Sequence, residues 1–538
     1  MKEINNKLEI EYIKNKYKLL YQIFLRLPGI TAILIIIFTF SGYMIFLFGG
    51  QGDYPYFVFI IAIFILLYYQ WWLIRSLEYI LFVFMSAFNL NKSEKRNNYK
   101  ILFDKNYIPT KEEQVEKDKI KNDISAQNIV HRFIIPTYKE SYEILDTTMC
   151  ALKDAIYNHK QFAITIAGEE RDEDNFKKIA KKLMLKYKDD FGYINFSIHP
   201  KNIPGEFPGK GGNITFAAKN EYKLILEKFG VNGDEVLVTT LDADTNIHKD
   251  YANVLTLKYL SEDNRVNKSY QPMILFFNNF WEAPFFSKIV SLLNSFWILF
   301  NSTKTLGMRN FSTHSQPLEA LIKVNFWSTQ TIVEDGHQYR RSFFGLNGDY
   351  SCVPIYTTVY QDSNLSKNLF STAKSQYNQI RRWAHGAEDV PYLFCQYLEN
   401  KDKILFGRFF YEFARLFEGT VMWATLHFIL MLGLTFSIIK DVQLSSFISL
   451  GSAISIFINI SILVLILSVS LQIYFCPWGK LKGFKNKFKY GFGFLFPYLI
   501  IVGPTLFIFT GLPAIHTQIA LILGKPFKNF NVTEKVRK

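Results

Sequence analysis

Long uncharged runs of apolar residues stand near both ends of this chain and are missing from its middle. Residues 28–48 and 56–74 form a first pair, and residues 419–439 and 447–475 form a second. Each run is close to, or above, the roughly 20 apolar residues that a helix needs to cross a bilayer. The first run is too long, and too rich in Phe and Ile, for the core of a cleavable signal peptide. The pattern therefore predicts transmembrane helices on both sides of a polar central domain.

Basic residues predict how these helices are oriented. The segments that flank the first pair, and residues 477–489 after the second, are rich in Lys and Arg, whereas the loop inside the first pair is not. The positive-inside rule places the basic segments, and with them the central domain, in the cytoplasm. We therefore expect an integral protein of a bacterial inner membrane or plasma membrane. Residues 490–524 are apolar but interrupted by prolines, and either a hairpin or re-entrant or interfacial helices fit them.

The central part of the chain alternates β-type runs with helical patterns. Residues 132–136, 162–168 and 236–241 are mainly apolar and rich in Ile, Val or Thr, and helical patterns cover residues 144–159 and 175–187. Such alternation predicts an α/β domain with a Rossmann-like, mainly parallel sheet and helices on both of its faces. In sheets of this kind ligands bind beyond the carboxyl ends of the strands.

These patterns divide the chain into an ordered series of segments. We expect a cytoplasmic N-terminal segment 1–27, a transmembrane hairpin 28–90, a linker 91–128, a cytoplasmic α/β domain 129–403, an interfacial helix 404–417, a transmembrane hairpin 418–476, a basic loop 477–489, the apolar segment 490–524 and a basic tail 525–538. The interfacial helix is inferred from an amphipathic pattern, which residues 285–300 share. A helix packed on a protein core has the same pattern, so that alternative stays open for both.

Composition narrows the classes of ligand. The chain is 49% hydrophobic and 17% aromatic, only 20% of its residues are charged, and its net charge is +14. A basic surplus suits nucleic acid, an anionic membrane surface or a phosphate-rich substrate. Because of the apolar runs, we expect membrane lipids and a phosphate-bearing substrate as partners, and no nucleic acid. The four cysteines lie far apart without metal-ligand spacing, so buried reduced thiols are expected.

Two carboxylates directly follow the third predicted strand, in Asp242-Ala243-Asp244. In a turn, this spacing lets both face a hard cation such as Mg²⁺, which also binds phosphate oxygens. The alternative is an acidic turn that caps a helix beginning near His248. Upstream, Lys210-Gly211-Gly212-Asn213 offers backbone N–H groups and a lysine charge to an anion, or is a plain flexible loop. It lacks the spacing of a Walker A loop.

A second acidic pair, Glu334-Asp335, lies about ninety residues further on. Asp335 is a candidate general base, because a hydroxyl group that attacks an anomeric carbon must lose its proton. One carboxylate serves a single inverting displacement, whereas a covalent intermediate on a second carboxylate would give retention. The alternative is that the pair caps a helix starting at Gly336.

A third motif, Gln379-Ile380-Arg381-Arg382-Trp383, follows on a predicted helix. Gln379, Arg382 and Trp383 share one face of that helix. The guanidinium can bind a diphosphate with two hydrogen bonds, and the indole can stack on the apolar face of a sugar ring. The alternative is an interfacial tryptophan with flanking arginines, which is common beside membranes.

In this order, the motifs resemble those of the membrane-embedded processive family 2 glycosyltransferases, the cellulose synthase and hyaluronan synthase group, whose catalytic domain is of the GT-A type. The resemblance covers about residues 130–390, and the membrane layout matches outside that range. The shared pieces are Ile135-Pro136-Thr137-Tyr138-Lys139-Glu140, Lys210-Gly211-Gly212-Asn213, Asp242-Ala243-Asp244, Val333-Glu334-Asp335 and Gln379-Ile380-Arg381-Arg382-Trp383.

The resemblance implies a role for each of these positions. It implies a nucleotide and donor-sugar site made of Thr137, Tyr138, Glu140, Glu169, Lys210 and Asn213. It implies a diphosphate site with a Mg²⁺ or Mn²⁺ ion made of Asp242, Asp244, Gln379 and Arg382, with Asp244 as the main metal ligand. It implies Asp335 as the base beside Glu334, Trp383 as the acceptor-stacking residue, and a gating loop with Phe530, Val532, Thr533 and Lys535.

Three departures from the family pattern matter. The usual Asp-Asp-Gly after the second strand is replaced by Gly168-Glu169-Glu170, which leaves the choice of nucleotide open. The usual Thr-Glu-Asp is Val333-Glu334-Asp335, and the gating-like motif lies at the very end of the sequence given. These differences suggest a relative of cellulose synthase rather than cellulose synthase itself.

The expected function is that of an inverting, metal-dependent hexosyltransferase that uses a nucleotide-diphosphate sugar, with a UDP-sugar favoured. The expected acceptor is a growing polysaccharide, lengthened processively and moved across the membrane. Transfer of a single sugar to a glycolipid or other lipid acceptor is the main alternative. A transporter with a regulatory nucleotide-binding domain is a further alternative, although the uncharged runs lack the charged residue that a transport site usually has.

Overall fold

The computed structural model describes residues 6–48, 55–121, 123–304, 306–438, 460, 466–467, 470, 493–494, 497–498 and 500–525. Several predictions fall wholly or mostly outside these residues. They are the later part of the hairpin 418–476, the basic loop 477–489, the tail after residue 525, and the gating-loop residues Phe530, Val532, Thr533 and Lys535.

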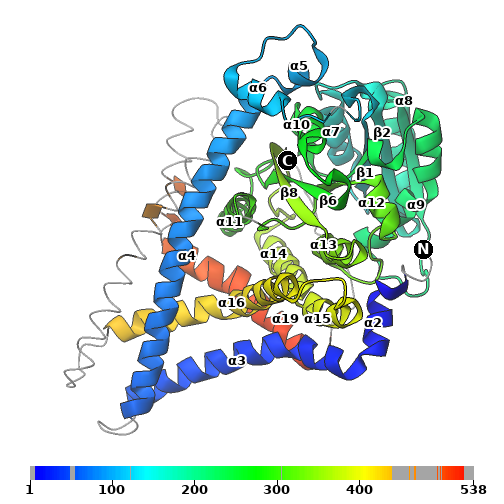
Figure 1. Ribbon diagram of the computed structural model, residues 1–538. Helices are drawn as coiled ribbons and strands as arrows, with labels where there is room; N and C mark the ends of the chain where they lie inside the picture. Colours follow the sequence, from blue (N-terminus) through cyan, green and yellow to red (C-terminus); the bar gives the residue numbers. More distant parts are fainter. Residues whose placement is uncertain are drawn as a thin grey trace.

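One eight-stranded sheet forms the centre of the α/β domain (Figure 1). Its spatial order is β3-β2-β1-β4-β7-β6-β8-β5, and the first four strands are parallel to one another. β7 runs antiparallel to β4 and β6, and β5 runs antiparallel to β8. The strands are β1 Val130–Pro136, β2 Phe162–Glu169, β3 Tyr193–His199, β4 Val236–Thr240, β5 Asn246–Ile247, β6 Lys268–Leu275, β7 His314–Pro317 and β8 Ser351–Tyr360.

Helices cover both faces of this sheet, as the apolar strands require. Alternate residues of β1 point to opposite faces, so Ile134 packs in one core cluster while Phe133 and Ile135 pack in another. One face is covered by α9 Lys210–Phe229 and α12 Leu318–Lys323. The other face is covered by α7 Tyr142–Lys153, α8 Glu173–Tyr187 and α10 Tyr251–Ser261. The predicted fold class, a mainly parallel α/β sheet with apolar helices on either side in the sequence, is confirmed.

The strands at the mixed end of the sheet were not predicted. β7 reads His-Ser-Gln-Pro and is fully buried, so its polar side chains give no apolar signal. β6 contains a proline and a shift of register between Pro272 and Met273. The segment 91–128, expected to be a linker, contains the short helices α5 Asn98–Phe103 and α6 Lys111–Lys117, the second of which begins with a capping box on Thr110 and Glu113.

Long apolar helices extend away from the domain in Figure 1. They are α3 Lys18–Phe48, α4 Pro55–Lys95, α16 Phe406–Ile438 and, after a π-helical turn Phe507–Gly511, α19 Leu512–Ile522. Within the described residues, Lys18–Ser41, Ile63–Lys95 and Ile500–Ile522 are long and apolar enough to cross a membrane. α16 is one continuous helix that contains both most of the segment 404–417 and nearly all of the predicted span 419–439.

The remaining helices of the domain bear directly on the site. They are α11 Phe285–Ser302, α13 Glu334–Gly345, α14 Leu369–Ala384 and α15 Asp389–Asn400. α11 lies between α4 and the sheet in Figure 1. Near the chain's start, the short helix α2 Ile10–Lys16 packs beside α15.

Candidate active site

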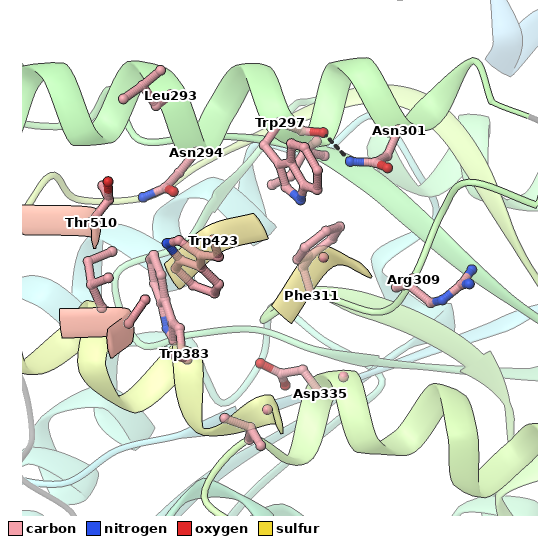
Figure 2. A pocket seen from close by; sticks show the side chains of 18 of the residues that line it. Leu293, Asn294, Trp297, Asn301, Arg309, Phe311, Asp335, Trp383, Trp423 and Thr510 are labelled. Carbon is pink, nitrogen blue, oxygen red and sulfur yellow. Dashed lines mark hydrogen bonds between the residues drawn. The ribbon is translucent and has the colours of Figure 1, made fainter. Parts of the chain in front are cut away.

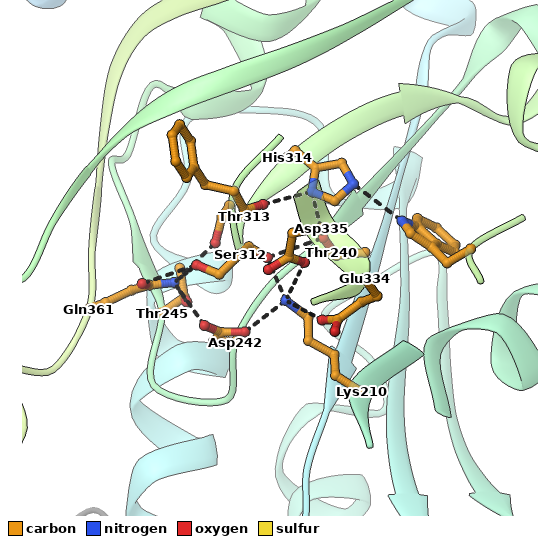
Figure 3. Close-up of polar contacts among 12 residues, drawn as sticks. Lys210, Thr240, Asp242, Thr245, Ser312, Thr313, His314, Glu334, Asp335 and Gln361 are labelled. Atoms are coloured by element: carbon orange, nitrogen blue, oxygen red, sulfur yellow. Dashed lines mark hydrogen bonds and ion pairs between the residues drawn. The ribbon is translucent and has the colours of Figure 1, made fainter. Parts of the chain in front are cut away.

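Three carboxylates from two distant segments meet around one lysine. Lys210 is the first residue of α9, and its Nζ lies 2.9 Å from Asp242 Oδ1, 3.2 Å from Asp335 Oδ1 and 3.8 Å from Glu334 Oε1 (Figure 3). The same ammonium donates to the carbonyl oxygen of Ser312 at 2.7 Å. Burial opposes the charge of Lys210, but the three acids outweigh burial and raise the pKa of the ammonium above its usual value. The Asp-x-Asp turn and the Glu-Asp pair therefore belong to one electrostatic unit.

The glycine next to Lys210 allows this close approach. A Cβ atom on Gly211 would lie 2.6 Å from the carbonyl oxygen of Ser328 and 3.1 Å from Cβ of Glu334. Such a distance to a backbone oxygen can be relieved only by moving α9 or the loop before α13. Lys210-Gly211-Gly212-Asn213 is therefore not a flexible loop but the packed first turn of α9.

A Gly211→Ala variant is accordingly expected to lose about 1–3 kcal/mol of stability, the usual cost of overpacking, together with a large part of its activity. Thermal melting of the purified protein and nucleotide release would measure the two effects. Gly407→Ala is the matched control, because a Cβ at that helical position meets no described heavy atom within 4 Å. A Gly211→Ala protein that melts and reacts like the wild type would show that the two segments are not in contact.

Glu334 and Asp335 open helix α13 instead of preceding it. The first turn of a helix favours negative charge, which helps to hold both carboxylates there. Burial first, and then the charge of Asp335, raise the pKa of Glu334 to about 8, while Lys210 opposes the shift. Burial therefore favours the protonated form of Glu334 in this pair. Asp335, the predicted base, is the more exposed member of the pair.

The raised pKa of Glu334 predicts a pH dependence of stability. The folded state holds this proton more tightly than the unfolded state, whose pKa is near 4.5, so its contribution is complete below that pH and is lost as the pH rises through about 8. Glu334→Gln cannot ionise and is expected to melt at least about 2 °C above the wild type at pH 9, as roughly 1 kcal/mol would give. Melting curves from pH 5 to 9 test this, with the exposed Glu227→Gln as control. Parallel curves for Glu334→Gln and the wild type would contradict it.

Contacts from the far end of the chain hold α13 in place. The fully buried guanidinium of Arg341 donates to the carbonyl oxygen of Leu8 at 3.1 Å and to Glu9 Oε1 at 2.7 Å. In front of α13, the backbone N–H of Glu11 donates to Gln330 Oε1 at 2.9 Å. The N-terminal segment, expected only to be cytoplasmic, therefore fastens the helix that carries Asp335.

Asp242 and Asp244 lie at the carboxyl end of β4, as predicted. Gln361 Nε2 donates to Asp242 Oδ2 at 3.3 Å, and the backbone N–H of Asp362 donates to Asp244 Oδ2 at 3.1 Å. Neither carboxylate caps α10, whose N-cap residue is Asp250. Among the described residues no group of three His, Cys, Asp or Glu side chains could hold a metal ion. A hard cation would thus take two protein carboxylates and complete its shell with phosphate oxygens and water, as Mg²⁺ commonly does.

A cluster of polar, aromatic and charged side chains lies where β1 and β2 end. Thr137 Oγ1 donates to Glu140 Oε2 at 2.8 Å, and the backbone N–H of Tyr138 donates to the same oxygen. The Arg171 guanidinium lies 4.5 Å from the centre of the Tyr138 ring, and its Nε donates to Glu169 Oε2 at 2.7 Å. Burial raises the pKa of Glu169, and Arg171 opposes that shift. An aromatic ring, a planar cation and a carboxylate in contact suit a flat heterocycle such as a nucleobase.

Helix α14 brings the third motif to the same space. Burial lowers the pKa of the Arg382 guanidinium, while the nearby acids Glu334, Asp242 and Asp335 oppose the shift, so Arg382 stays charged beside them. Gln379 Oε1 accepts from Gln376 Nε2 at 3.1 Å. Figure 2 shows Trp383, Trp423 and Trp297 around one open space, with Asp335 on its far side.

All predicted site residues that the structure describes line a single cavity of about 1900 Å³. The cavity runs from the ends of the strands to α4, α11 and α16, and its predicted members are Thr137, Tyr138, Glu140, Glu169, Lys210, Asn213, Asp242, Asp244, Glu334, Asp335, Gln379, Arg382 and Trp383. Asn213 also has a structural contact, since its Nδ2 donates to the carbonyl oxygen of Ala167 at 2.6 Å. The roles of these residues stay predictions, but their convergence is a finding.

Sequence reasoning missed a second ring of polar residues around the acids. Gln361 donates not only to Asp242 but also to Thr245 Oγ1 at 3.1 Å and Ser312 Oγ at 3.0 Å. His314 is buried, which lowers its pKa to about 4, and its Nε2 accepts the indole N–H of Trp327 at 3.2 Å. The proton of this neutral ring is therefore on Nδ1, 2.8 Å from the carbonyl oxygen of Phe311. Gln361 and Asp362 directly follow an apolar strand, and this position in the sequence could have identified them as candidate site residues.

No protein-family model and no curated protein matches this chain. Among solved structures, the mannosyltransferase PcManGT from Pyrobaculum calidifontis, in complex with GDP-Man and Mn²⁺, is 11% identical, with a TM-score of 0.38 over 64% of this chain and 87% of that one. S. aureus TarS 1-349 in complex with UDP-GlcNAc is 13% identical, with a TM-score of 0.32 over 75% and 94%. GalNAc-T7 with UDP, GalNAc and Mn²⁺ is 10% identical, with a TM-score of 0.32 over 54% and 57%. Function cannot be inferred from similarities of this size.

Proposed function

We propose that this chain is an inverting, metal-dependent membrane glycosyltransferase. It transfers a hexose from a nucleotide-diphosphate sugar, with UDP-sugars favoured, to a growing polysaccharide, and its catalytic domain faces the cytoplasm. The observation that carries the proposal is the convergence of Asp242, Glu334 and Asp335 on Lys210, with Arg382 and Trp383 facing the same cavity. Two cations, several acids and a stacking indole at the ends of parallel strands suit a diphosphate, a metal ion and a sugar together.

The donor is proposed to lie across the strand ends. The cluster of Tyr138, Glu169 and Arg171 binds the nucleobase, and Lys210 and Arg382 attract the diphosphate oxygens. Asp244 and Asp242 would hold Mg²⁺ or Mn²⁺, and two carboxylates beside phosphate oxygens fit such an ion. When bound, the ion neutralises charge that builds on the departing diphosphate.

The reaction proposed is a single displacement. An acceptor hydroxyl attacks the anomeric carbon from the face opposite the diphosphate, and its proton passes to Asp335. The bond between the anomeric carbon and the diphosphate oxygen breaks as the new bond forms, so the configuration inverts and a nucleotide diphosphate leaves. Burial favours the protonated form of Glu334, which keeps a second negative charge away from Asp335.

The size and lining of the cavity support a long acceptor. Its volume of about 1900 Å³ exceeds the roughly 300–1,000 Å³ of an ordinary small-molecule pocket. Trp383, Trp423 and Trp297 line it between the acids and the apolar helices, and indoles present the flat apolar faces on which sugars stack. Repeated transfer, with the product moving along this cavity and across the membrane, is therefore the favoured form of the proposal. The alternative is one transfer to a lipid acceptor. The exposure of cavity residues between α11 and α16 is the observation that supports this alternative.

The test is nucleotide diphosphate release by the purified protein in nanodiscs, given UDP- and GDP-sugars in turn with Mg²⁺ or Mn²⁺. Metal-dependent release with one donor establishes the transferase and identifies the sugar, and sizing the product separates a polymer from a single transfer. Activity without any gradient argues against a transporter. Absence of release with every donor, together with absence of UDP and GDP binding, would refute the proposal.

A further inference from the structure

An ion pair joins α4 and α16 at the point where the uncharged stretch of each helix begins. In α4, residues 55–74 contain no Asp, Glu, Lys or Arg, and Arg75 ends that run; in α16, Glu418 stands directly before the equally uncharged residues 419–438. Arg75 Nη2 lies 3.2 Å from Glu418 Oε1, so both helices enter their uncharged stretches at one level. The Arg75 guanidinium also lies 5.4 Å from the centre of the Trp71 ring. Tryptophan beside arginine is typical of the membrane interface, the level at which lipid phosphates lie.

The cavity that contains Asp335 reaches this level. Arg75 and Glu418 both line it, as do Trp297 on α11 and Phe410 on α16. Trp297 is 52% exposed and Phe410 is 56% exposed, so the cavity opens outward between α4, α11 and α16. Figure 2 shows Trp297, Asn301 and Arg309, which line this end, and α4, α11 and α16 are labelled in Figure 1.

Cations exceed acids around the opening. Arg75, Lys304, Arg309 and Arg415 line this end of the cavity, with Glu78, Glu412 and Glu418 as the neighbouring acids. Lys304 pairs with Glu78 at 3.0 Å, and Arg309 pairs with Glu412.

Arg415 differs from the other three cations. It donates to the carbonyl oxygens of Leu306 and Gly307 and to Asn301 Oδ1, and no carboxylate of a described residue lies within 4.0 Å of it. Carbonyl and amide oxygens orient a guanidinium without cancelling its charge. The opening therefore keeps one positive charge, at the level of the lipid phosphates.

We propose that this opening binds the phosphate of a lipid-linked saccharide, which is the acceptor of the reaction. The phosphate lies against Arg415 and Lys304, the lipid tail against the exposed apolar surfaces of α4 and α16, and the saccharide along the cavity toward Trp383 and Asp335. This inference rests on the proposed function and specifies its acceptor. A neutral polysaccharide alone would leave the surplus positive charge at the opening without an anionic partner. The donor diphosphate does not supply that partner, because Lys210 and Arg382 are the cations proposed to bind it.

Binding can be measured apart from transfer. The protein in nanodiscs of phosphatidylcholine is titrated with farnesyl phosphate, farnesol and inorganic phosphate, and occupancy is read by native mass spectrometry. Farnesyl phosphate is expected to bind at least tenfold more tightly than farnesol or inorganic phosphate. Arg415→Gln is expected to reduce that preference at least fivefold, whereas Arg415→Lys keeps most of it. Lys178→Gln, which removes one exposed charge on α8, is the matched control and changes nothing.

The outcomes test the acceptor site and the transferase function separately. Equal binding of farnesol would leave only an apolar groove, and equal binding of inorganic phosphate would indicate a soluble anion site; either overturns the inference, as does an unchanged preference in Arg415→Gln. Nucleotide binding by the same variant samples shows that they are folded. If sugar transfer occurs without farnesyl phosphate binding, only the lipid-linked acceptor is wrong. If farnesyl phosphate binds as expected but no nucleotide or nucleotide sugar does, the proposed function is wrong.

Discussion

Replacing Asp335 with asparagine is expected to lower sugar transfer by roughly 10²–10⁴-fold, the usual contribution of a general base. Asparagine has nearly the same size as aspartate, so the cavity keeps its shape, but the amide cannot take the proton of the acceptor hydroxyl. Nucleotide binding should remain within about twofold, because Asp335 is assigned to the acceptor side of the reaction. Nucleotide diphosphate release with the active donor, and equilibrium binding of the nucleotide, measure the two quantities separately.

Two further variants make the Asp335 experiment specific. Glu334→Gln should keep most of its activity at pH 7, because burial favours the protonated form of the carboxyl it replaces. Asp174→Asn, on the exposed surface of α8, controls for loss of a carboxylate and should behave as the wild type. If Asp335→Asn kept more than a tenth of the activity while Glu334→Gln lost it, the base would be Glu334 and the assignment within the pair would be reversed.

Replacing Lys210 with methionine is expected to have the second largest effect. Three carboxylates within 4 Å of the ammonium would lose their common counter-charge, so the acidic side chains beside the incoming diphosphate would no longer be balanced. Activity at pH 7 should fall at least about 100-fold, since removing one partner of a buried charged group costs several kcal/mol. The pH profile of the residual activity should differ from that of the wild type, because the positive charge that balances these acids is missing.

A thermal measurement separates this electrostatic effect from simple unfolding. Mg²⁺ or Mn²⁺ should raise the melting temperature of Lys210→Met more than that of the wild type, because the ion can replace the missing ammonium beside Asp242. Lys223→Met, on the exposed face of the same helix, is the matched control. Equal metal-induced shifts in both proteins, with an unchanged pH profile of activity, would show that Lys210 does not hold the acids together.

Much of the fold could be predicted from the chain because the relevant signals are local. The strands β1, β2 and β4 are mainly apolar and buried on both faces, and α8 has a clear amphipathic repeat. The mixed end of the sheet gave no such signal. β7 is buried yet polar, because His314, Ser315 and Gln316 are satisfied by partners far away in the sequence.

From the amino-acid sequence we could predict which groups are present and roughly where they stand: acids after β4, acids before an amphipathic helix, an Arg-Trp pair on another helix, and uncharged runs at both ends. Residue type and spacing along one chain suffice for this. Only in the folded chain does Lys210 balance both acidic motifs, does burial favour the protonated form of Glu334, and does Arg341 hold the N-terminal segment against α13. These properties depend on burial and on distances of a few ångströms between residues far apart in the chain, which no local pattern encodes.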